Sequence, residues 1–268
     1  MPGIVVKCIN TWKSKMPEYE YILWDTHKFD ISSVKFVQDA YNARKWAFAA
    51  DYIRLYAVYK EGGIYFDTDV YVLKSFNDLL RFDFFSSLER DLTTISPKSR
   101  YYIPFKQNEN ADYINIEPKR YRGFGLQAAI FGSCAKNPFI RDCMEWYEQN
   151  KYELYNGGPI ESEQFLAPDI YAAIAQKYGF KYIAGFQELN GNMVILPADR
   201  FPNGLYKTDN AYAVHLCNNS WTGYYRYERA ASFMERIKQN NFIRGLLGKR
   251  KYYTWEEKIK NGGESKLL

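Results

Sequence analysis

The alternation of apolar and polar positions divides the chain into segments of helical and of strand character. Apolar residues recur with a helical period over residues 4–14, 35–60, 138–151, 162–178, 226–240 and 254–260, which predicts helices there. Short apolar or alternating runs predict strands at 19–25, 64–73, 82–88, 126–133, 193–197 and 211–216. Residues 90–120 are polar and read as a long loop. Strands that alternate with helices predict an α/β fold.

The helix predicted over residues 44–60 is apolar on nearly all sides, which predicts that it is buried. Asp51 and Arg54 lie in its middle, three residues apart and therefore on one face. Charged groups inside a protein need partners. Two interpretations follow: the pair is an ion pair that locks the helix, or both side chains point into a cleft and bind hydroxyl groups.

Two carboxylates follow this helix closely. Gly62 and Gly63 predict a helix stop, and residues 64–73 predict a strand that turns at Asp67 and Asp69. On an extended backbone, side chains at i and i+2 leave the same face, where two like charges repel. A divalent cation is the simplest species to hold them together, since Asp oxygens suit hard metals. Such a cation can clamp a diphosphate.

Asp67 and Asp69 allow three other interpretations. A solvated turn is disfavoured by the apolar flanks. Haloacid-dehalogenase-like phosphatases place Thr or Val two residues beyond the second Asp, where this chain has Tyr71. A glycoside hydrolase would set its acid and base about 5–9 Å apart across a cleft, whereas these two residues share one short segment.

The chain has two histidines, and the sequence around each one predicts where it lies. His27 is predicted to lie on the surface, whereas His215 ends a predicted strand. His215 is either a metal ligand or a hydrogen-bonded packing residue. Ser220 and Trp221 can offer O–H and N–H donors to phosphate oxygens. The bend at residues 157–159 is either a plain turn or part of the site.

Composition adds constraints on size and partners. The 268 residues are 47% hydrophobic and include 25 Tyr and 18 Phe, enough for a full core. The net charge of +5 suits an anionic ligand or an anionic membrane surface. No Lys/Arg tract interleaves with aromatic residues, so no nucleic-acid partner is expected.

Cysteine spacing and hydropathy indicate the cellular environment of the protein. The four cysteines, at 8, 134, 143 and 217, form no C-x-x-C pair, which argues against a zinc site. No secretory signal and no long apolar stretch is present. We therefore expect a cytoplasmic protein with reduced thiols. The basic, aromatic tail at 226–260 leaves open a peripheral contact with the inner membrane surface.

Residues 50–54 (A-D-Y-I-R) and 62–69 (G-G-I-Y-F-D-T-D) together resemble the sugar-binding, D-x-D-containing region of glycosyltransferase family 32. That family includes yeast mannosyltransferases and bacterial capsule and O-antigen enzymes, and clostridial glucosylating toxins share the pattern. Residues 21–25, 137–140, 158–159, 215 and 220–221 also follow in the expected order. The resemblance therefore spans most of residues 7–225.

The resemblance implies a GT-A-type, Rossmann-like fold with a mostly parallel central sheet flanked by helices. Residues 1–225 would form the transferase domain, and residues 226–268 a helical extension of the same domain. Relatives usually begin with a strand of the type I-P-K-I-I-H-x-x-W. This chain opens with M-P-G-I, already inside the first predicted helix. The N-terminal strand, which would help to hold the nucleoside, is therefore expected to be missing.

The resemblance also implies an activity. It predicts a retaining transfer of a hexose from a UDP- or GDP-hexose to a glycan or lipid-linked glycan, with Mn²⁺ or Mg²⁺ as cofactor, in surface polysaccharide synthesis. A second hypothesis is a nucleotide-sugar-binding protein with little or no turnover, because the first strand is absent.

Roles are carried over residue by residue from the matching motif. The donor sugar would be bound by Asp51, Arg54, Gly63 and Tyr65. The residues implied to be catalytic and to ligate the metal are Asp67 and Asp69, of which Asp67 would also contact ribose or sugar. His215 would be a further metal ligand, and Ser220 and Trp221 would hold the diphosphate.

Overall fold

The computed structural model describes residues 3–90, 125–150, 152, 166–204 and 208–217. The α-helices are α1 (Gly3–Lys15), α2 (Lys35–Asn42), α3 (Trp46–Glu61), α4 (Pro138–Gln149) and α5 (Ala167–Ala175). The strands are β1 (Gly63–Phe66), β2 (Val70–Val72), β3 (Phe84–Ser87), β4 (Ile130–Ser133), β5 (Gln187–Leu189), β6 (Met193–Leu196) and β7 (Ala213–His215). Short 3-10 turns occur at Ile31–Ser33, Asn77–Leu79 and Gln176–Tyr178. The predicted α/β class is therefore confirmed.

The larger sheet has five strands in the order β1-β4-β3-β6-β5. Among these pairs, β3 and β6 run parallel, whereas β1–β4, β3–β4 and β5–β6 are antiparallel. The expectation of a mostly parallel sheet is thus wrong, and the sheet is mixed. The tight connection between β5 and β6 explains part of this, because a parallel crossover needs a dozen or more residues.

A second, two-stranded sheet pairs β2 with β7 in antiparallel register, with Val70 opposite His215. The segment predicted as one turning strand therefore contributes to two sheets: β1 to the larger and β2 to the smaller. The three residues between them, 67–69, form the turn that joins the sheets. This connection places both aspartates of the D-x-D motif at the sheet junction.

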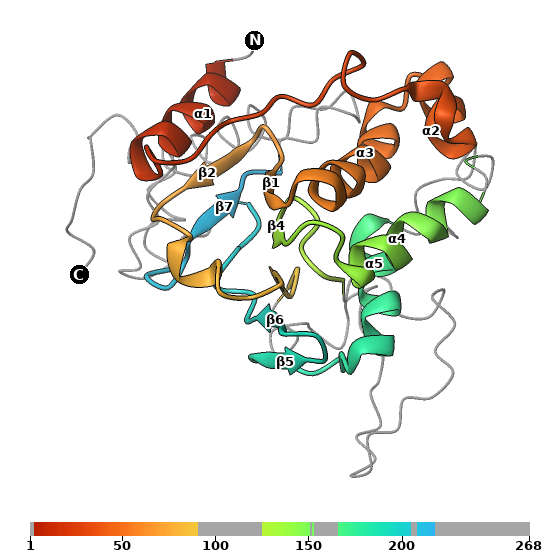
Figure 1. The fold of residues 1–268 in the computed structure, drawn as a ribbon. Coiled ribbons are helices and arrows are strands. Elements are labelled where there is room, and N and C mark those ends of the chain that lie inside the picture. Colours follow the sequence, from red (N-terminus) through yellow and green to blue (C-terminus); the bar gives the residue numbers. More distant parts are fainter. Residues whose placement is uncertain (1–2, 91–124, 151, 153–165, 205–207, 218–268) are drawn as a thin grey trace, which may run out of the picture.

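The helices cover the strands unequally. In Figure 1, α3, α4 and α5 gather on one side of the larger sheet, whereas α1 lies beside β2. The main core fills the space between the helices and the larger sheet, and includes Phe36, Leu55, Phe84, Phe131 and Phe139. A second aromatic cluster, around Phe76, Phe85 and Phe201, connects the two sheets. The turn at residues 67–69 is thus flanked by well-packed strands.

The junction between α3 and β1 follows the predicted helix stop. Gly62 has φ of +72° and donates its N–H to the carbonyl of Val58 at 2.9 Å. A Cβ at this position would lie 3.0 Å from the backbone nitrogen of Ala135. Glycine is favoured here both by the left-handed backbone and by the close approach. The reversal directs the chain from the helix into β1.

Most predicted elements are confirmed, although one strand is wrong. Residues 19–25 form no strand, because they pair with no other strand of the described chain. Leu23 is 72% exposed, and the hydroxyl of Tyr21 donates to the carbonyls of Trp12 and Met16. The alternation of apolar and polar residues predicts a strand, but this segment is held by the side chain of Tyr21 at the end of α1 and not by backbone hydrogen bonds to another strand.

Several predicted features fall outside the described residues. They are most of the loop at 90–120, the start of the helix at 162–178, the bend at 157–159 and the helices at 226–240 and 254–260. The division into residues 1–225 and 226–268 stays a prediction. Within the described segments, no helix is long and apolar enough to cross a bilayer.

Candidate functional site

Helix α3 presents Asp51 and Arg54 on one face, as their spacing predicts. A guanidinium nitrogen of Arg54 lies 2.9 Å from Oδ1 of Asp51, and the two side chains are 7% and 13% exposed. The mutual ion pair, one of the two interpretations of this pair, is therefore present. It does not exclude the other, because Arg54 also lies 3.5 Å from Oδ1 of Asp67.

Arg54 connects α3 to the rest of the site. It donates to the carbonyl of Ala128, just before β4, at 2.8 Å and to the carbonyl of Ala50 at 3.2 Å. Together with its contacts to two carboxylates, these bonds leave little of the guanidinium free for a ligand. Arg54 is thus suited to fix the positions of Asp51 and Asp67, while Asp51 keeps some exposure toward a ligand.

Tyr65 adds a second constraint on Asp67. Its hydroxyl donates to Oδ1 of Asp67 at 2.6 Å, and its ring lies 4.9 Å from the guanidinium carbon of Arg54. Burial, the largest cause, raises the pKa of Tyr65 well above its ordinary value, so the phenol stays a donor. Asp67 is thereby held from two directions.

The turn between β1 and β2 brings Asp67 and Asp69 together with His215. Nε2 of His215 lies 3.4 Å from Oδ1 of Asp69 and 3.8 Å from Oδ2 of Asp67. A ligand atom from each of these residues lies within 4.8 Å of the others. The backbone N–H of Leu216 bonds to the carbonyl of Asp69 at 3.1 Å, which fixes the turn against the end of β7. The predicted convergence of the three side chains is observed.

Acidic side chains outnumber basic ones in this group of described residues. The carboxylates of Asp51, Asp67 and Asp69 lie beside the guanidinium of Arg54 and the imidazole of His215. Burial raises the pKa of Asp51 to about 7, although Arg54 opposes the shift. Burial alone would lower the pKa of His215, but its contacts with Asp69 and Cys217 raise it well above the ordinary value. The site therefore favours an added positive charge, either a proton or a metal ion.

The donor atoms of Asp67, Asp69 and His215 suit the divalent metal that the D-x-D motif implies. Two carboxylates and one imidazole match the ligand preferences of Mn²⁺, and the carboxylates also suit Mg²⁺. The net negative charge of the cluster favours a divalent cation. Asp67, Asp69 and His215 therefore fit such an ion.

Two further residues of the site carry no signal in the sequence. Asn203 lies 3.1 Å from Nδ1 of His215, and Gln127 donates to Oδ1 of Asn203 at 2.8 Å. Neither belongs to a motif, and a single Asn or Gln has no characteristic spacing. Only the fold shows that both lie behind His215.

The remaining predicted site residues have different outcomes. Gly63 begins β1 with φ of +101°, next to the helix stop. Ser220 and Trp221 lie outside the described residues, so their predicted diphosphate contact stays a prediction. His27 is exposed, as predicted.

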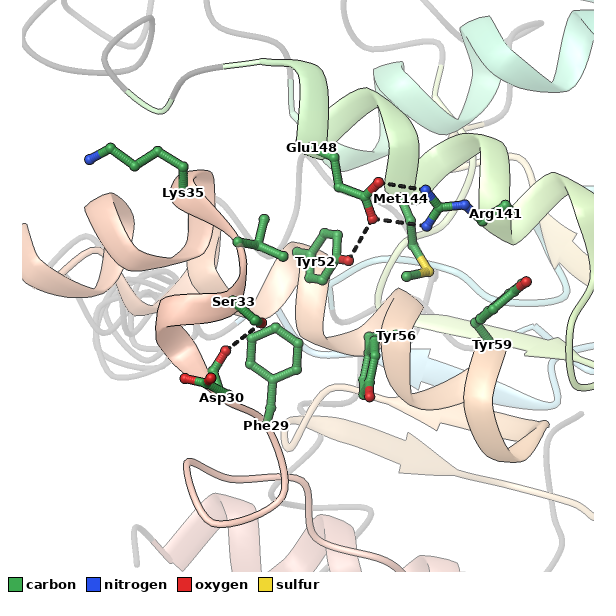
Figure 2. Close-up of a pocket in the computed structure, with 11 residues that line it drawn as sticks. Phe29, Asp30, Ser33, Lys35, Tyr52, Tyr56, Tyr59, Arg141, Met144 and Glu148 are labelled. Atoms are coloured by element: carbon green, nitrogen blue, oxygen red, sulfur yellow. Dashed lines mark hydrogen bonds and ion pairs between the residues drawn. The ribbon is translucent and has the colours of Figure 1, made fainter.

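A hollow of about 640 Å³ lies elsewhere, between the segment 29–35, α3 and α4 (Figure 2). It is lined by Tyr52, Arg141 and Glu148 among others, and by none of the predicted site residues. Arg141 donates to Glu148 at 2.8 Å and Tyr52 donates to the same carboxylate at 2.8 Å. Because these polar groups already satisfy one another, the carboxylate cluster is the better candidate for the functional site.

A protein-family match covers the same part of the chain. The family described as a glycosyltransferase sugar-binding region containing a DXD motif matches residues 2–85. The matched part contains Asp51, Arg54, Tyr65, Asp67 and Asp69, which the fold brings together. No curated protein matches the chain. The matched region and the arrangement of its acidic residues support a glycosyltransferase.

Proposed function

We propose that this protein is a metal-dependent, retaining glycosyltransferase. It would transfer a hexose from a UDP- or GDP-hexose to a saccharide or lipid-linked saccharide, in surface polysaccharide synthesis. The observation that carries this proposal is the convergence of Asp67, Asp69 and His215 beside the buried pair of Asp51 and Arg54. A nucleotide-sugar donor requires a cation for its diphosphate. It also requires a nearby carboxylate that can accept hydrogen bonds from the hydroxyls of the sugar.

The residues have distinct roles in this proposal. Asp67, Asp69 and His215 would hold Mn²⁺ or Mg²⁺, which supplies positive charge to the diphosphate as it leaves. Asp51 would accept hydrogen bonds from hydroxyls of the donor sugar and fix the ring relative to the acceptor. Arg54 and Tyr65 would hold these carboxylates in place. Ser220 and Trp221 would donate to the diphosphate.

The experiment is a donor screen with Mn²⁺, read by release of the nucleoside diphosphate from a panel of UDP- and GDP-hexoses. Wild-type protein should hydrolyse or transfer at least one donor, and EDTA should abolish this turnover. Asp69→Asn should abolish it as well, because the cation loses a ligand. Asp209→Asn is the matched control, since Asp209 is exposed and belongs to no site described above. The anomeric configuration of the transferred sugar, read by NMR, tests retention.

Three outcomes would contradict the proposal in different ways. Full activity of Asp69→Asn would remove the D-x-D motif from the reaction. Calorimetric binding of a nucleotide sugar without any product would favour a binding protein with little turnover. Cleavage of a glycan that survives EDTA and needs no nucleotide would favour a glycoside hydrolase.

A further inference from the structure

We propose that Asn203 and Gln127 are positioning residues that keep a proton on Nδ1 of His215, so that Nε2 is the nitrogen that binds a cation beside Asp67 and Asp69. This inference rests on the cation site of the proposed function, but not on the sugar chemistry. It follows from a chain of hydrogen bonds in which the backbone fixes each side-chain amide in turn.

The first link is Gln127. Its Oε1 accepts from the backbone N–H of Ala129 at 3.1 Å, and its Nε2 donates to the carbonyl of Phe201 at 3.2 Å. Rotating this amide by half a turn would set its NH₂ against an N–H and its oxygen against a carbonyl. The backbone therefore determines which atom of Gln127 faces Asn203, and that atom is the donor nitrogen.

The second link is Asn203. Its Oδ1 accepts from Gln127 at 2.8 Å, and its Nδ2 donates to the carbonyl of Glu89 at 3.2 Å. The opposite orientation would place two donors together on one side and two acceptors on the other. Oδ1 of Asn203 is thus the atom that lies 3.1 Å from Nδ1 of His215.

The third link is His215. An acceptor oxygen beside Nδ1 requires a proton on that nitrogen. Sγ of Cys217 lies 3.5 Å from the same nitrogen and is oriented to donate to the carbonyl of His215, so its lone pairs also accept. In the neutral imidazole, Nε2 is then unprotonated and faces the carboxylates at 3.4 and 3.8 Å. A bare lone pair pointing at two carboxylates is unfavourable, so Nε2 carries either a proton or a cation, and it is the nitrogen from which a cation can displace the proton. Outer partners of this kind orient metal-binding histidines in general.

The tautomer can be observed directly, because the chain has only two histidines. Long-range ¹H–¹⁵N NMR of the protein loaded with Zn²⁺, a diamagnetic probe, should show His215 protonated at Nδ1 and metal-bound at Nε2. His27→Gln assigns the signals. Asn203→Leu should populate the other tautomer and weaken Mn²⁺ binding, measured by EPR titration, by about 10-fold or more. Asn190→Leu, at an exposed position that takes part in none of these hydrogen bonds, is the matched control.

Two results would overturn the inference. One is a spectrum of the Zn²⁺-loaded wild-type protein in which Nε2 of His215 carries the proton and Nδ1 binds the metal, a measurement that does not depend on a variant that folds. The other is a folded Asn203→Leu protein that binds Mn²⁺ as tightly as wild type. A wild-type protein that shows the expected tautomer and binds Mn²⁺, yet turns over no nucleotide sugar, would leave the inference intact and refute the proposed function.

Discussion

The hydroxyl of Tyr65 lies 2.6 Å from Oδ1 of Asp67, two residues further along the chain. Hydrogen bonds to charged acceptors contribute more than neutral ones. We therefore expect Tyr65→Phe to reduce the free energy of unfolding by about 1–3 kcal/mol and to weaken Mn²⁺ binding, because Asp67 loses one of its two constraints. Urea unfolding and EPR titration measure the two effects. Tyr41→Phe, at an exposed tyrosine, should change neither, and equal losses in both variants would contradict the prediction.

Arg54 should not tolerate replacement by lysine. An ammonium keeps the charge but cannot contact Asp51, Asp67 and the Ala128 carbonyl together as the planar guanidinium does. Breaking buried pairs of this kind costs roughly 3–5 kcal/mol, and we expect Arg54→Lys to approach that loss of stability. Arg200→Lys provides the comparison, since Arg200 meets Asp199 near the surface. Similar unfolding curves for the two variants would refute the locking role of Arg54.

The ionisation of Asp51 should make the metal-free protein less stable as the pH rises from about 4 to about 7. Burial raises the pKa of Asp51 to about 7, so the folded protein binds this proton more tightly than the unfolded chain. The resulting stabilisation is complete below the unfolded pKa and is lost as the pH rises through the folded one. Asp51→Asn should flatten the pH profile of urea unfolding. If the free energy of unfolding changes with pH equally in wild type and Asp51→Asn between pH 4 and pH 7, the prediction is refuted.

Gly62→Ala should destabilise the protein. The positive-φ backbone of Gly62 costs an alanine about 1–3 kcal/mol, and its Cβ would meet the backbone nitrogen of Ala135 at 3.0 Å. Gly3→Ala is the matched control, because a Cβ at Gly3 meets no atom within 4 Å. Thermal unfolding should separate the two variants, and a Gly62→Ala protein as stable as Gly3→Ala would refute the steric argument.

The sequence predicted the elements whose cause is local. The spacing of Asp51 and Arg54 placed them on one helical face, and Gly62 predicted the end of α3. Asp67 and Asp69 do converge, although through a turn between two strands rather than along one extended strand. The glycine reversal and the apolar flanks were sufficient evidence for this part of the site.

Features that depend on distant pairing were not predictable in the same way. The direction of β4 between β1 and β3 follows from the packing of the whole sheet, so a mostly parallel arrangement was wrongly expected. Residues 19–25 alternate like a strand but find no partner in the described structure. Gln127 and Asn203 are ordinary polar residues until the fold brings them behind His215.

The turn at residues 67–69 has a mechanical consequence. Asp67 follows a strand of the larger sheet, whereas His215 ends a strand of the smaller one. A divalent ion bound by both Asp67 and His215 would crosslink the larger sheet to the smaller one. Slower amide hydrogen exchange in β7 would then report ion occupancy in solution, before any sugar or nucleotide is added.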